Sequence, residues 1–161
     1  NLGLKFGPGT DNVNTREDAL ITKQSLQDTS VILSPSLGLQ AKALGPNFYD
    51  EIESVFNGFH QHVLISQHTF DADWPSWEKH PAGDEQVILI SGSAEFVLFQ
   101  TGVEQVTPLT SPGDYLIVPR NVWHTARILE RTTCLFITPG EGTMHASHPL
   151  SSVSNAAGTT E

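Results

Sequence analysis

The chain changes character at about residue 59. From there to about residue 140, short apolar or alternating blocks are interrupted by Gly, Pro or Asn. Interruptions about every 8 to 12 residues are typical of an antiparallel sandwich or barrel. The predicted strands are 62–70, 74–80, 85–90, 94–100, 103–109, 115–118, 122–129 and 132–138.

The connections between these strands are short. Ser91-Gly92-Ser93 is predicted to be a hairpin turn between 85–90 and 94–100, and Pro112-Gly113 suits a type II turn. After residue 60 no helical segment separates one strand from the next. About eight short strands in this order favour a double-sheet jelly roll over a parallel α/β fold.

The residues before 59 predict an arm and short helices. Residues 1–14 are rich in Gly, Pro and Asn and predict an extended arm, 15–26 a short helix, and 31–33 a strand. An amphipathic helix is predicted from the helical spacing of Phe48, Ile52, Val55, Phe56 and Phe59, with Asn47 as its cap and Gly58 as its stop.

The same patterns divide the chain into three parts. Residues 1–58 form the arm and helices packed on the barrel, and 59–142 form the jelly-roll domain. From residue 143 the chain is rich in Ser, Thr, Gly and Ala and has no apolar period. We expect 143–161 to be a mobile tail.

The composition of the chain indicates which classes of binding partner to expect. The chain has 18 acidic and 8 basic residues, a formal net charge of −10, and no cluster of Lys and Arg, so we expect no nucleic acid. No stretch reaches the roughly 18 consecutive apolar residues of a membrane span, so we expect no membrane. The single cysteine, Cys134, lies in an apolar run and is predicted to be buried and unpaired. We expect a cytoplasmic protein.

Candidate chemistry concentrates between residues 77 and 92. Glu78 and His80 are two apart, so in an extended segment both project to the same face, and Pro81 favours that extension. Residues 81–84 suit a type I turn that brings Glu85 back beside His80. A histidine with one or two carboxylates on one face predicts a metal site.

Two spacings extend this candidate site. One runs His80-x4-Glu85-x6-Gly92, and the other runs Gly113-x5-Pro119-x4-His124. Together they resemble the two motifs of cupins, over roughly residues 60–140. The resemblance implies an all-β cupin jelly roll, also called a double-stranded β-helix, here preceded by a short helical or extended segment.

The sequence departs from the cupin pattern at three positions. Glu78 replaces the first histidine, Asn121 replaces an inner glycine, and the asparagine that ends the second motif is absent. Asparagine tolerates a positive φ, so the turn at Asn121 is expected to survive. The Glu78 replacement changes a site of three histidines and one glutamate into two histidines with one or two carboxylates.

The resemblance implies that His80, Glu85 and His124 bind one divalent metal ion, of which Fe, Zn, Mn and Ni are the candidates. Such a set leaves coordination positions open. Glu78 is either a fourth ligand or a general base beside the ion, and it is the candidate catalytic residue.

Three functions fit this site. We expect a metal-dependent enzyme, of oxygenase or isomerase type, that acts on a small organic molecule. The alternatives are a non-catalytic ligand- or metal-binding module, and a metal-free acid/base enzyme like the sugar epimerases. We also expect a homodimer, because exposed sheet edges are often paired and the N-terminal arm offers material for exchange.

For several other side chains, the sequence gives weaker evidence of a role in the candidate site. His62 and His68 lie on one face of a predicted strand and could line the pocket, although an edge or surface position is expected. Arg120 could bind a substrate carboxylate at the pocket mouth, although pairing with a surface acid is expected. Trp74, Trp77 and Trp123 are expected to fill the core or a dimer contact.

Overall fold

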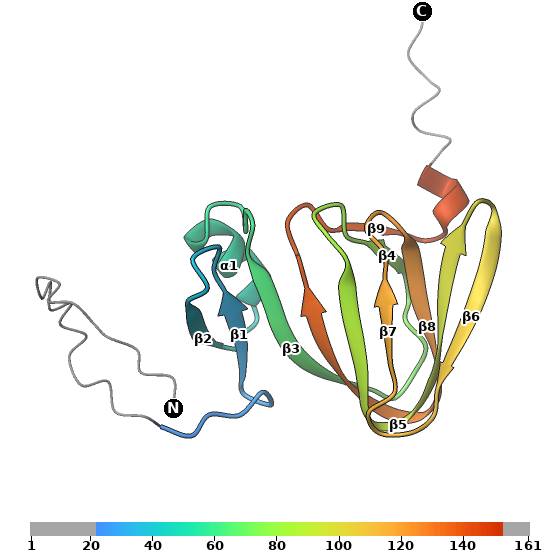
Figure 1. Ribbon diagram of the computed structural model, residues 1–161, viewed down its shortest axis with the longest axis horizontal. Coiled ribbons are helices and arrows are strands. Elements are labelled where there is room, and N and C mark those ends of the chain that lie inside the picture. Colours follow the sequence, from blue (N-terminus) through green and yellow to red (C-terminus); the bar gives the residue numbers. More distant parts are fainter. Residues whose placement is uncertain (1–21, 153–161) are drawn as a thin grey trace, which may run out of the picture.

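Two long antiparallel strands, β5 (Glu85–Gln100) and β8 (Trp123–Thr138), form the frame of the protein. The computed structural model describes residues 22–152. Each strand is 16 residues long, and the two pair along most of their length. Both bend near the middle, where their register shifts between residues 89 and 94. Each strand therefore contributes one half to each of two sheets that face one another (Figure 1).

The remaining strands extend these two sheets. In the first sheet, the leading half of β5 pairs with β7, and the trailing half of β8 pairs with β3, which continues into β1 and β2. In the second sheet, the other halves pair with β6 and with β4, which continues into β9. The bounds are β1 (Thr29–Leu33), β2 (Leu39–Ala43), β3 (Val63–Phe70), β4 (Trp77–Lys79), β6 (Val103–Leu109), β7 (Tyr115–Val118) and β9 (Met144–Ala146).

The predicted all-β jelly roll is confirmed, and β3, β6 and β7 match their predicted bounds to within one residue. The hairpin turn predicted at residues 91–93 is wrong, because β5 continues through it as one strand. Gly92 has a φ of +85°, and an added Cβ would lie 2.2 Å from the carbonyl oxygen of Arg131. The Ser-Gly-Ser sequence therefore forms a bulged corner where β5 passes from one sheet to the other, and only glycine fits there.

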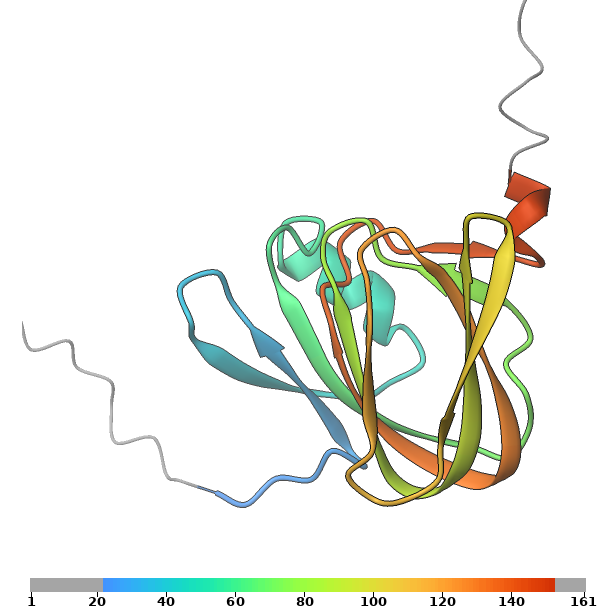
Figure 2. The ribbon, with the colours of Figure 1, turned by 45° about the vertical axis from the view of Figure 1, so that its right-hand side comes forward.

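One α-helix, α1 (Phe48–Val55), lies beside β3, and the β1–β2 hairpin projects away from the barrel (Figure 2). The helix starts after Asn47, as predicted, and buries Phe48 and Ile52 against Ile32 and Leu64. The helix predicted for 15–26 lies largely outside the described residues, and none of residues 22–28 is helical. Within 22–152, no helix has the length and apolarity that a membrane span requires.

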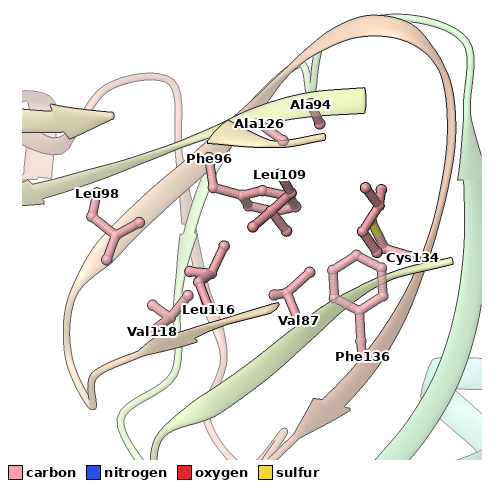
Figure 3. Packing of buried hydrophobic residues seen from close by; sticks show 11 residues of the cluster. Val87, Ala94, Phe96, Leu98, Leu109, Leu116, Val118, Ala126, Cys134 and Phe136 are labelled. Atoms are coloured by element: carbon pink, nitrogen blue, oxygen red, sulfur yellow. The ribbon is translucent and has the colours of Figure 1, made fainter. Parts of the chain in front are cut away.

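The main core fills the space between the two sheets. Inward-facing side chains of β5, β7 and β8, among them Val87, Phe96, Leu116 and Phe136, pack together there (Figure 3). Cys134 is fully buried in the same cluster, as predicted. Burial of each large apolar side chain in such a core is worth about 1.5 to 3 kcal/mol.

A separate apolar cluster lies on the outer side of the second sheet. Val97 is fully buried there between Trp77 and Trp123, and Ala146 of β9 packs on the cluster. The structure thus differs from the predicted tail at residues 144–146, which pair with β4 and help to cover this face. A short 3-10 helix, η1 (Pro149–Ser152), follows. Local sequence gives no signal for this strand, because the surface that it covers exists only after the sheet has formed.

Replacing Gly92 with Ala is expected to lower the free energy of unfolding by about 3 kcal/mol or more, since the Cβ meets backbone atoms and the positive φ is strained. Urea denaturation followed by circular dichroism measures this change. The matched control is Gly45→Ala, where an added Cβ meets nothing within 4 Å. Equal unfolding midpoints for Gly92→Ala and the wild type would contradict the claim that only glycine fits at this corner.

Candidate metal centre

Strand pairing brings four metal-ligating side chains together from distant parts of the chain. Glu78 on β4 lies directly opposite His124 on β8. His80 follows the end of β4, where its carbonyl accepts a hydrogen bond from the backbone N–H of Asn121 at 3.1 Å. Glu85 begins β5. Asn121 has a φ of 62°, so the asparagine does adopt the glycine-like conformation that the sequence predicted.

The four side chains converge on a common point. One ligand atom from each of Glu78, His80, Glu85 and His124 lies within 4.8 Å of all the others. The Nε2 atoms of His124 and His80 lie 3.0 and 3.4 Å from the Glu85 carboxylate oxygens. The same two atoms lie 3.5 and 3.9 Å from Oε1 of Glu78. Two ligands that are each about 2.1 Å from one ion lie about 3.0 Å apart at a right angle and about 3.4 Å apart at the tetrahedral angle. The observed spacing fits a shared ion.

Hydrogen bonds fix both imidazole rings with Nε2 toward this point. The Thr143 hydroxyl donates to the carbonyl of Gly140 at 2.9 Å, so it accepts from Nδ1 of His80, also at 2.9 Å. Nδ1 of His124 donates to the carbonyl of Val122 at 3.2 Å. With the Nδ1 proton held in this way, the neutral form of each ring presents its Nε2 lone pair, which is the arrangement of metal-bound histidines.

Three atoms at the centre of the cluster are buried without an aligned hydrogen bond. They are Nε2 of His80, Nε2 of His124 and Oε2 of Glu85, although His124 and Glu85 are in close contact. The other carboxylate oxygen of Glu85 accepts a hydrogen bond from the Thr138 hydroxyl. Buried polar atoms without such bonds are costly, and a bound cation would satisfy all three at once. The residues present therefore fit a divalent metal ion.

Burial and mutual contact shift the pKa values of the acid and the base in this cluster. Burial alone would raise the pKa of Glu85, but the two neighbouring imidazoles outweigh it and lower that pKa to about 2. Burial alone would lower the pKa of His124, but the Glu78 and Glu85 carboxylates outweigh it and raise that pKa to about 9. The raised pKa favours a proton on His124 between the two carboxylates, and a metal ion that binds Nε2 would replace that proton.

A cavity of about 890 Å³ adjoins the cluster, and Glu78, His80 and Glu85 line it. Glu78 differs from the other three: its side chain is 22% exposed, whereas those of His80, Glu85 and His124 are 4%, 2% and 0% exposed. Aromatic side chains form much of the remaining wall, namely Tyr49, Phe59, Phe70, Trp74 and Phe136. The cluster is therefore accessible to a small molecule chiefly past Glu78.

Several residues at the site were not assigned to it from sequence. His68 lines the cavity, so the edge or surface position expected for it is wrong, and burial lowers its pKa, an effect that the Glu78 carboxylate only partly offsets. His62 does not line the cavity and packs against the rings of Phe56 and Phe59. His145, which had no expected role, places Nε2 3.3 Å from Oε2 of Glu78. Thr143 and His145 lie in a segment whose composition gives no signal.

Arg120 does not reach the cavity. Its guanidinium donates to the carbonyl of Ala82 at 2.7 Å, and its backbone N–H donates to Asp84 at 2.8 Å. The side chain of Arg120 thus bonds to a backbone carbonyl, whereas pairing with a surface acid was expected. These bonds join the turn after His80 to the turn before β8 and so help to hold the two motifs together.

Comparisons with known proteins find similar solved structures. No family model and no curated protein matches the chain. Among solved structures, the chain is similar to a cupin superfamily protein from Desulfitobacterium hafniense, with 27% identity over 47% of this chain and 65% of that one and a TM-score of 0.40. It is also similar to a protein with a double-stranded β-helix domain from Klebsiella pneumoniae, with 25% identity over 52% and 74% of the two chains and a TM-score of 0.43.

A third similar structure is oxalate decarboxylase from Bacillus subtilis, whose Mn(II) centres have been studied. The identity is 19%, over 62% of this chain but only 29% of the decarboxylase, and the TM-score is 0.46. The matched structures thus include cupins, which the sequence motifs resemble. Because all three TM-scores lie below 0.5, any chemistry assigned to this protein has to rest on its own residues.

Metal binding is expected to release about one proton per ion at pH 7, since His124 must lose its proton whereas Glu85 is already ionised. Between pH 7 and 9 the affinity should rise about tenfold per pH unit, and it should level off above the His124 pKa. Calorimetric titration of Zn²⁺ in two buffers of different ionisation enthalpy measures the release. Identical binding enthalpies in both buffers at pH 7 would contradict a protonated His124.

Replacing Thr143 with Val is expected to weaken Zn²⁺ binding about 10- to 100-fold, because Nδ1 of His80 loses its acceptor. Competition with a chromophoric chelator measures the affinity. The control is Thr107→Val on β6, outside the cavity wall. If both variants bind as tightly as the wild type, the hydroxyl does not orient the ring.

Proposed function

We propose that this protein, with its cupin jelly roll, is a mononuclear metal-dependent enzyme of oxygenase or isomerase type that acts on a small organic molecule. The observation that carries the proposal is a set of buried imidazole and carboxylate atoms without hydrogen-bond partners, at the wall of a cavity of about 890 Å³. A cavity of this size suits a small-molecule substrate.

His80, Glu85 and His124 are the proposed ligands of the ion. All three are buried, their rings and carboxylate are oriented by hydrogen bonds, and their closest mutual contacts are 3.0 and 3.4 Å. When bound, a divalent ion supplies Lewis acidity, a template for substrate oxygen or nitrogen atoms and, if it is iron, oxygen activation.

Glu78 is the proposed proton-transfer residue. It is the most exposed of the four, it lines the cavity, and its contacts to the two imidazoles are longer than those of Glu85. Its second oxygen faces His145, whose side chain is 61% exposed. Glu78 can therefore take a proton from a molecule in the cavity and pass it through His145 toward solvent.

The residues of the cavity wall limit the chemical classes of substrate that can bind. Its aromatic side chains suit an apolar or ring-bearing portion, and its lining residues include no Lys or Arg. An anionic group of a substrate would find no lysine or arginine to pair with there. Its partners would be the ion itself or a protonated histidine of the wall, such as His145.

Glu78→Gln is expected to retain one metal ion per chain and to lose about 10²- to 10⁴-fold in metal-dependent turnover, because the amide cannot accept the proton. Plasma mass spectrometry measures the metal, and chromatography of small-molecule mixtures incubated with the protein detects turnover. The control is Glu53→Gln, another carboxylate of the cavity wall, which should behave as the wild type.

Three outcomes would contradict the proposal. Turnover that survives removal of the metal by chelation would favour a metal-free acid/base enzyme of the epimerase kind. Metal binding with turnover equal in Glu78→Gln and the wild type would remove Glu78 from the chemistry. A protein that binds metal and small molecules but converts none of them would favour a non-catalytic binding module.

A further inference from the structure

The outer face of the first sheet is apolar and uncovered. Along β3, β5, β7 and β8, alternate residues point into the core, where Leu64, Val87, Leu116 and Phe136 are buried. The residues between them face outward. We call this the outer face, and its apolar members are Ile65, Ile88, Tyr115, Ile117, Leu135 and Ile137.

Strand register makes these side chains contiguous. One row crosses the four strands as Ile65, Ile137, Gln86 and Ile117, and the next row crosses them as Gln67, Leu135, Ile88 and Tyr115. Val31 of β1 continues the first row beyond Ile65. Six of the eight positions in the two rows are apolar, and the other two are uncharged glutamines.

Nothing in the described part of the chain covers this face. The helix α1 packs against Ile32 and Leu64, which have the opposite parity, so it lies on the other side of the sheet. Figure 1 shows β3, β7 and β8 with no helix drawn across them. Tyr115 and Ile117 are 60% and 55% exposed. By contrast, β9 helps to cover the apolar outer side of the second sheet, where Val97 is fully buried.

The charge of the chain indicates which partner can bind to the outer face. The chain carries a formal net charge of −10, so two copies repel one another over most of their surfaces. The two rows carry no charged residue, and an approach through them brings no like charges into contact. A basic partner would find no carboxylate there to pair with. A second copy, which presents the same uncharged apolar rows, is the complementary occupant.

The size of the two rows suits the centre of a dimer interface. Four strands at about 4.8 Å spacing, with two alternate residues of each in the rows, span about 19 by 13 Å, on the order of 250 Å² in projection. A stable interface buries roughly 800 Å² per partner, so the two rows would form its apolar centre and the polar residues around them its rim.

We propose that two copies of this protein pack through the outer face as a symmetric homodimer, with Ile88, Leu135 and Ile137 near its centre. The inward side chains of β3 that line the cavity, such as Ser66 and His68, have the opposite parity. The dimer therefore leaves the candidate metal centre accessible, and it holds or fails independently of the proposed function.

Sedimentation velocity of the full chain tests this arrangement. The wild type should sediment as a species of twice the 17.5 kDa chain mass at micromolar concentration. Ile117→Glu should raise the dimer dissociation constant at least ~30-fold, because it places a charge in the apolar contact of both copies. The matched control is Val103→Glu on β6, a 65% exposed apolar residue of the other sheet, which should remain dimeric.

Circular dichroism and bound Zn²⁺ verify that each variant is folded, and Tyr115→Glu serves as a second variant if Ile117→Glu unfolds. A monomeric wild type at 100-fold higher concentration, or a dimer unaffected by both variants, overturns the proposal. So does a monomeric wild type that co-sediments with phosphatidylcholine vesicles, since the face would then bind a lipid surface.

Discussion

The corner at Gly92 is the constraint on which the candidate site depends. His124 pairs with Leu98, which is 13 residues along β5 from Glu85 and thus about 40 Å away in a straight strand. Because β5 and β8 bend together, the strand ends that carry Glu85 and His124 face one another across the barrel. Nε2 of His124 lies 3.0 Å from Oε2 of Glu85. The close approach of Gly92 to the Arg131 carbonyl permits this bend. A backbone feature without a reactive group therefore assembles the chemistry.

Burial of the polar atoms in the assembled site costs free energy, and a bound ion can reduce this cost. Two imidazoles and a carboxylate are withdrawn from water, while hydrogen bonds from their far sides fix their orientation. In the metal-free protein, a proton on His124 partly balances the carboxylates. A divalent cation balances them more fully, so metal binding, ionisation and the local fold are linked in one equilibrium. Glu78 lies at the boundary between this dry cluster and the cavity.

The sequence was informative where the signal is local. The spacing of His80, Glu85 and His124 predicted a site that the structure brings together, and Asn121 predicted a positive φ that is present. It was misleading at residues 91–93, because Ser-Gly-Ser is equally compatible with a hairpin turn and with a bulged corner. The strand β9 and the contacts of Thr143 and His145 could not be predicted, since they depend on a surface and a pocket that exist only in the folded chain. The dimer, the cytoplasmic location and the ligand roles stay predictions.

The claim that these side chains bind one metal ion is tested most directly by a crystal structure with anomalous diffraction at metal absorption edges, on protein purified without chelator. We expect a single peak about 2.0 to 2.3 Å from Nε2 of His80, Nε2 of His124 and a Glu85 oxygen. An ordered cluster that contains only water after incubation with Zn²⁺, Mn²⁺, Fe²⁺ or Ni²⁺, or a peak bound by other residues, would contradict it.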